Sequence, residues 1–131
     1  MAALDGVRVL LVEDDTEMRE MLVLVLTRHG AVLRAVEGAQ AALDAVRADP
    51  PDVIVSDLAM PGEDGHTFLQ RLRRLPARRG GRTPAIALTA QGSRESRLAS
   101  RKAGYHYHLT KPVDTNKLVE IVAGLVRITR R

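Results

Sequence analysis

Apolar residues gather in five short runs along the chain, and a stretch with helical spacing follows each run. The runs are nearly unbroken, which is typical of strands that are covered on both faces of a sheet. Consecutive parallel strands need a long crossover connection, usually a helix. The pattern therefore predicts an α/β fold, with strands at residues 7–12, 32–36, 53–56, 84–88 and 105–109.

Between these runs, apolar residues recur at every third or fourth position, as they do on the buried side of a helix. Ser93 is a natural cap for the start of the fourth such stretch, and Gly104 is a natural stop for its end. Five strand–helix pairs predict a doubly wound, five-stranded parallel sheet with helices on both faces, and we expect residues 1–131 to form a single domain. The helices are expected at about residues 16–29, 39–46, 68–75, 93–103 and 118–128.

The composition is that of an ordinary globular domain, with 45% hydrophobic and 27% charged residues in a chain of 131. The core must be aliphatic, because the chain has one Phe, two Tyr and no Trp. Met18 and Met21 are expected to fill the core, and Tyr105 and Tyr107 are expected to point inward. Cysteine is absent, which excludes disulfides, thiolate metal sites and a thiol nucleophile. With neither a membrane span nor a signal peptide in the pattern, we expect a soluble cytoplasmic domain.

The formal net charge is +4, and much of the excess lies in an arginine-rich segment, residues 71–82, and in the arginines of the C-terminal tail. A nucleic-acid surface would carry its basic residues on a recognition helix, or would interleave them with aromatic side chains for stacking. Neither arrangement is visible, so we interpret these arginines as solvated and expect no direct binding of nucleic acid.

Polar residues follow the predicted strands directly. In doubly wound sheets the functional crevice lies at the carboxyl ends of the strands. The chemically informative side chains all occur at such positions, and we expect the fold to bring them together. They are Glu13, Asp14, Asp57, Thr89 and Lys111.

These residue types suit phosphoryl chemistry. Carboxylates that cluster repel one another unless a cation or a proton intervenes, and hard oxygen ligands from Glu13, Asp14 and Asp57 suit Mg²⁺. The metal ion would neutralise charge on a transferring phosphoryl group. Asp57 is the best placed nucleophile, since a carboxylate can form an acyl phosphate directly. Lys111 can pair with Asp57 and then with a phosphoryl oxygen, and the Thr89 hydroxyl can donate to another.

Four motifs carry a resemblance to a bacterial response-regulator receiver domain, over about residues 6–126. They occupy residues 11–15, 56–62, 88–90 and 110–112, and read LVEDD, SDLAMPG, LTA and TKP. The resemblance implies a flavodoxin-like fold, Mg²⁺ as cofactor, and a cis peptide bond at Lys111-Pro112. It also implies that Asp14 binds the metal directly, that Glu13 acts through water, and that the backbone carbonyl of Ala59 completes the metal shell.

The resemblance further implies that Asp57 accepts a phosphoryl group from a histidine kinase or a histidine phosphotransfer protein. Thr89 would then move toward the phosphoryl group while an aromatic residue on the fifth strand turns inward. At that position, three residues before Lys111, this chain has His108 where many family members have Tyr or Phe. Two consequences stay open: His108 could rotate inward and add sensitivity to pH, or it could uncouple Thr89 from the surface.

Two other functions are alternatives to a phosphoacceptor. By the resemblance, a phosphoacceptor is an enzyme only in the loose sense that it catalyses its own phosphorylation and part of its own dephosphorylation. A magnesium-dependent phosphohydrolase that forms an aspartyl phosphate usually needs a second acid where Ala59 stands. A non-phosphorylated pseudo-receiver would be expected to lose Asp57, Asp14 or Lys111, and all three are present. The segments 84–90 and 108–113 resemble receivers attached to hybrid sensor kinases. The kinase partner and a possible homodimer stay open.

Overall fold

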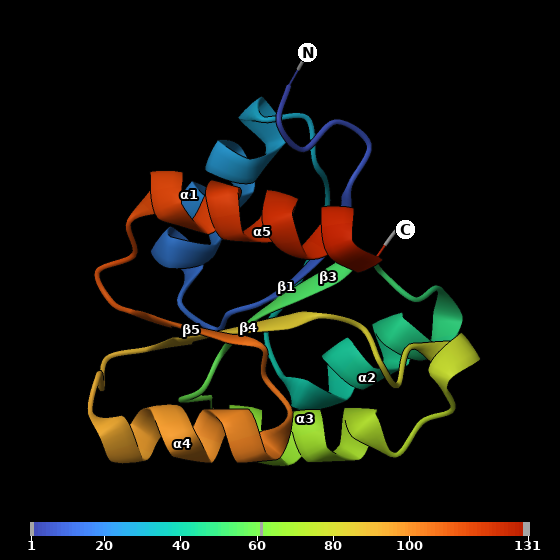
Figure 1. Ribbon diagram of the computed structural model, residues 1–131, viewed down its shortest axis with the longest axis vertical. Helices are drawn as coiled ribbons and strands as arrows, with labels where there is room; N and C mark the ends of the chain where they lie inside the picture. The colour runs from blue at the N-terminus through green and yellow to red at the C-terminus, as the bar shows by residue number, and fades with distance from the viewer. Residues whose placement is uncertain (1, 61, 130–131) are drawn as a thin grey trace.

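The computed structural model describes residues 2–60 and 62–129, and it contains one sheet of five parallel strands in the order β2-β1-β3-β4-β5. Helices α1 and α5 cover one face of this sheet, and α2, α3 and α4 cover the other (Figure 1). The predicted fold class is therefore confirmed. The elements are β1 (Arg8–Val12), α1 (Thr16–Arg28), β2 (Val32–Val36), α2 (Ala39–Ala48), β3 (Val53–Asp57), α3 (Gly65–Arg73), the 3₁₀ turn η1 (Ala77–Arg79), β4 (Ala85–Thr89), α4 (Arg94–Ala103), β5 (Tyr107–Thr110) and α5 (Thr115–Thr129).

The core has two layers because successive residues of a strand point to opposite faces. In β1, Val9 and Leu11 pack with residues of α1 and α5, whereas Leu10 and Val12 pack with residues of α2 and α3. Every residue of β3 is buried, as expected for the central strand of a sheet covered on both sides. The rigid position of its last residue, Asp57, follows from this burial.

Helix ends follow local hydrogen-bonding rules. The Ser93 hydroxyl accepts the Ser96 N–H at the start of α4, and Gly104 ends that helix with a φ of 115°, both as predicted. The carboxylate of Asp64 accepts the Thr67 N–H at 2.8 Å, so α3 begins three residues earlier than its apolar spacing indicated. Periodicity marks the buried face of a helix, and it does not reveal a polar first turn.

Two predicted core positions are wrong. Tyr107 is 47% exposed, because it begins β5, an edge strand with a neighbour on one side only. Met21 is 38% exposed, whereas the adjacent Leu22 is fully buried and defines the inner face of α1. Tyr105 is buried as predicted, but it lies just before β5 rather than within it. Met18 packs against the core from a partly buried position.

The prediction that the arginines of residues 71–82 are solvated is wrong for Arg73. Its Nη1 donates to the carbonyls of Thr83 at 2.7 Å and Gly81 at 3.1 Å, and its Nη2 donates to that of Gly104 at 2.7 Å. It thereby joins the end of α3 to the loops before β4 and β5. Gly81 is required in this arrangement, since a Cβ there would lie 1.9 Å from the Leu75 carbonyl oxygen. The neighbouring arginines 74, 78, 79 and 82 are exposed as predicted. Within the described residues, no helix is long and apolar enough to cross a bilayer.

Candidate functional site

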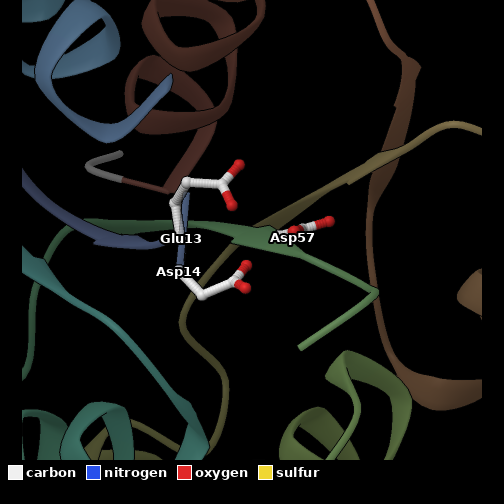
Figure 2. Close-up of side chains that lie close together, drawn as sticks. All are labelled: Glu13, Asp14 and Asp57. Carbon is white, nitrogen blue, oxygen red and sulfur yellow. The ribbon is translucent and has the colours of Figure 1, made fainter. Parts of the chain in front are cut away.

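The sheet register brings the polar ends of the strands to one edge. Val12 is level with Ser56, Asp57 with Leu88, and Thr89 with Thr110, so the residues that follow each strand emerge side by side. The carboxylates of Glu13 and Asp14 project toward that of Asp57 (Figure 2), and one oxygen from each lies within 4.8 Å of the others. The three carboxylates that the sequence singled out therefore form one cluster.

A single ammonium group compensates part of this negative charge. Lys111 Nζ lies 3.2 Å from Glu13 Oε1 and 3.3 Å from Asp57 Oδ1, and both carboxylates belong to buried residues. Burial raises the pKa of Glu13 to about 7, and Asp57 adds to the rise. Burial alone would lower the pKa of Lys111, but the two carboxylates outweigh it and raise that pKa. The ammonium is thus held firmly in its charged form between them.

The cluster fits a divalent cation. The notch brings three carboxyl groups together with the Lys111 ammonium, so acidic groups outnumber the basic group that contacts them. The raised pKa of Glu13 reflects this excess, and a bound divalent cation would relieve it. Opposite ligands of an octahedral Mg²⁺ ion lie about 4.2 Å apart, given Mg–O distances of about 2.1 Å. The observed cluster, within 4.8 Å, is close to that spacing before any ion draws the oxygens together. The donor set also contains only hard oxygen atoms, as magnesium prefers.

The backbone around Asp57 is fixed from several sides. Asp57 Oδ1 accepts the Ala59 N–H at 3.2 Å, and the Ser56 hydroxyl donates to the Asp57 carbonyl at 3.0 Å. Gly65 packs beneath, where a Cβ would lie 2.7 Å from the Asp57 carbonyl oxygen and 2.8 Å from Leu58 Cα. The buried hydroxyl of Tyr105 then donates to the Gly65 carbonyl at 2.8 Å. Sequence reasoning missed Gly65 and this role of Tyr105, because nothing local marks a glycine as a packing requirement.

The acidic loop after β1 is also held by a residue that sequence reasoning missed. Arg19 Nη1 donates to the Glu13 carbonyl at 3.0 Å, and the Asp15 N–H donates to Glu13 Oε2 at 3.3 Å. Asp15 itself is exposed, and its carboxylate caps α1 by accepting the Glu17 N–H. Asp15 therefore serves the start of α1 and lies outside the carboxylate cluster.

Thr89 and His108 are joined through the loop after β4. The Gln91 N–H donates to Thr89 Oγ1 at 3.1 Å, and His108 Nε2 lies 3.1 Å from the Gln91 carbonyl oxygen. On its other side, His108 Nδ1 lies 3.2 Å from the Ser100 hydroxyl of α4. Burial lowers the pKa of His108. The sequence identified Thr89 and His108, but it did not identify Gln91 and Ser100 as the groups between and beyond them. The Lys111-Pro112 peptide bond, at the end of this region, is cis as the resemblance implied.

Comparisons with known proteins agree with this geometry. The family model described as "Response regulator receiver domain" matches residues 9–123. The chain belongs to the response regulator receiver family. A 14.6 kDa protein from Leptolyngbya boryana is 38% identical to this receiver over 122 residues, which are 93% of this chain and 92% of that protein. Probable histidine kinase 2 of Oryza sativa is 36% identical, and the match covers 95% of this chain but only 13% of the kinase.

Solved structures are similar over nearly the whole receiver. A putative response regulator from Chloroflexus aurantiacus has a TM-score of 0.88 at 32% identity, over 94% of this chain and 99% of that one. The receiver domain of a sensor histidine kinase from Pseudomonas aeruginosa has a TM-score of 0.84 at 27% identity, over 92% and 98% of the two chains. That structure holds a magnesium ion in its active-site cleft. The receiver is therefore related both to response regulators and to domains within histidine kinases.

The close packing of Gly65 beneath Asp57 leads to a prediction about stability. Gly65→Ala would force backbone atoms of residues 57 and 58 to move, and overpacking of this kind costs on the order of 2 kcal/mol in free energy of unfolding. Gly124→Ala is the matched control, because nothing lies within 4 Å of its added Cβ in α5, and alanine favours a helix interior by about 1 kcal/mol. Urea unfolding should show opposite signs for the two variants. Equal stability of Gly65→Ala and the unmodified chain would contradict the packing argument.

Proposed function

We propose that this receiver accepts a phosphoryl group on Asp57 from a phosphohistidine of a histidine kinase or a histidine phosphotransfer protein, in the cytoplasm. The observation that supports it best is the Lys111 ammonium, held between the carboxylates of Glu13 and Asp57 beside that of Asp14. Such a notch combines a nucleophile, a cation that can follow the transferred group, and ligands for a divalent metal. Glu13, Asp14, Asp57 and the Ala59 carbonyl would hold Mg²⁺, which neutralises phosphoryl charge when bound.

In the proposed transfer, an oxygen of Asp57 attacks the phosphorus of phosphohistidine. The P–N bond breaks, its electron pair returns to the imidazole nitrogen, and an acyl phosphate forms on the aspartate. Lys111 would exchange its contact with Asp57 Oδ1 for a phosphoryl oxygen. Thr89 Oγ1 accepts the Gln91 N–H, so its own hydroxyl proton stays available for a second phosphoryl oxygen.

The same residues provide a route from the phosphoryl group to the surface. When the Thr89 hydroxyl turns toward the phosphoryl oxygen, the Gln91 N–H loses its acceptor. The carbonyl of Gln91 faces His108, which also contacts Ser100 of α4. Movement of Gln91 would therefore change the contacts of His108 and the position of α4. In this proposal His108 takes the part that Tyr or Phe has in many relatives, and the phosphoryl group biases a two-state equilibrium.

Asp57→Asn tests the phosphoacceptor assignment. With a radiolabelled small phosphodonor and Mg²⁺, the unmodified receiver should acquire a hydroxylamine-labile label, because an acyl phosphate is cleaved by that nucleophile. Asp57→Asn should lose the label. Asp64→Asn is the control, since it also removes a carboxylate but leaves an amide oxygen that can cap α3. Magnesium-dependent labelling that persists in Asp57→Asn would contradict the assignment. Absence of labelling in the unmodified receiver would favour a non-phosphorylated interaction module.

A second experiment tests magnesium binding separately from phosphorylation. Asp14→Asn removes a carboxylate from the cluster, whereas Asp15→Asn removes one from the neighbouring exposed position and still allows a cap for α1. Magnesium should raise the melting temperature by mass action, and the concentration needed should rise at least about tenfold in Asp14→Asn. Asp15→Asn should follow the unmodified chain. An equal shift in both variants would indicate general electrostatic attraction.

The His108 route predicts a spectroscopic change. Addition of beryllofluoride, a phosphoryl analogue, together with Mg²⁺ should shift the imidazole ¹⁵N resonances of His108, because its contacts with Gln91 and Ser100 are lost or altered. Thr89→Val lacks the hydroxyl and should suppress the shift. His29, which contacts the Val25 carbonyl at the end of α1, is the internal control. Bound beryllofluoride, seen by ¹⁹F resonance, without movement of His108 would contradict the route.

A further inference from the structure

The edge of the sheet opposite to Asp57 contains a wide recess of about 710 Å³. Its walls come from the start of β1, the end of α3, and the loops that precede β3, β4 and β5. This volume lies within the range of about 300–1,000 Å³ that is typical of small-molecule sites. The recess is separated from the acidic cluster by the length of the strands, so it does not belong to the phosphoacceptor site.

Four arginines line the recess, and three of them have no carboxylate partner among the described residues. Arg73, Arg78 and Arg82 all contribute to its walls. Among the described carboxylates, none lies within ion-pair distance of these three side chains, whereas Arg8, on the far side, pairs with Asp49 at 2.9 Å. Desolvation lowers the pKa of Arg73, which is consistent with a guanidinium that has carbonyl oxygens rather than a carboxylate around it. The recess therefore carries uncompensated positive charge.

The available donors match an oxyanion. Arg73 is committed to backbone carbonyls, so it contributes charge more than hydrogen bonds. Arg78 and Arg82 are exposed and present two planar guanidinium forks. His106 also lines the recess, and because the Ala85 N–H donates to its Nδ1 at 3.2 Å, its own proton lies on Nε2. Desolvation and the charge of Arg73 lower the pKa of His106, which favours this neutral tautomer.

We propose that this recess binds a diphosphate or triphosphate group, either free or carried by a nucleotide. Guanidinium forks bind phosphate oxygens in pairs, and several adjacent cations suit an anion of high charge better than a single carboxylate. The recess is larger than a bare diphosphate requires, and proline rings at positions 50, 51 and 84 form an apolar part of its wall that can pack against a nucleoside. A single-stranded nucleic acid is disfavoured, since the described lining has no Phe, Tyr or Trp for base stacking.

The test is a calorimetric titration of the intact chain with orthophosphate, tripolyphosphate and ATP, at constant ionic strength and with EDTA to remove Mg²⁺ from the acidic edge. Arg78→Gln and Arg82→Gln should each weaken binding of tripolyphosphate at least about tenfold, as expected for loss of a charged hydrogen bond. Arg79→Gln is the matched control: Arg79 belongs to the same 3₁₀ turn as Arg78 and carries the same charge, but it does not line the recess. That variant should bind within about twofold of the unmodified chain.

Two further readouts locate the ligand and identify its source. The Nε2 resonance of His106 should shift on binding, whereas the imidazole resonances of His66, in the first turn of α3 near the acidic edge, should not. Tighter binding of ATP than of tripolyphosphate would assign the ligand to the nucleotides, and equal binding would assign it to polyphosphates. Equal weakening by Arg79→Gln would overturn the proposal in favour of diffuse attraction. Absence of phosphate binding at millimolar concentration would also overturn the proposal. So would a chain that binds no phosphate but self-associates through this recess, with the self-association lost in Arg78→Gln and Arg82→Gln.

Discussion

The contact of one ammonium group with two buried carboxylates is the constraint on which the functional edge depends. Glu13 and Asp57 lie close together with little access to water, and such a pair cannot stay ionised without a nearby cation. Lys111, which follows the edge strand β5, supplies that cation through contacts of 3.2 and 3.3 Å. The remaining negative charge makes the notch receptive to a divalent metal. Preorganised charge of this kind is what phosphoryl transfer requires of a protein.

The fold separates charges of opposite sign along the strands. Acidic groups gather at the carboxyl ends, and uncompensated arginines gather at the amino ends. A strand of five residues spans roughly 16 Å, and the aliphatic core between the helices fills that distance. This separation exceeds the Debye length of about 8 Å at physiological ionic strength, so salt screens the exposed charges at one edge from those at the other. A parallel sheet creates this polarity because all of its strands run in the same direction.

The connection between the acidic edge and the surface has its own chemistry in this chain. His108 occupies a position between the Gln91 carbonyl and the Ser100 hydroxyl, where a phenylalanine could make neither hydrogen bond. Imidazole has two nitrogens on opposite sides of the ring, so it can link the loop after β4 to α4 at the same time. In the proposed route from Thr89, the hydrogen bonds of Gln91 and His108 would be lost or altered one after another.

The sequence by itself determined the alternation of strands and helices, the capping of α4, and the group of polar residues at the carboxyl ends, because all of these depend on local spacing and on the direction of a parallel sheet. Only the tertiary structure decided which side chains touch. Gly65 is needed because the Asp57 carbonyl oxygen lies 2.7 Å from the position that a Cβ would take, and Arg73 is held by carbonyls from the loops before β4 and β5. Tyr107 is exposed because β5 lies at the edge. These contacts and exposures depend on residues that are distant in the sequence, so the local pattern does not predict them.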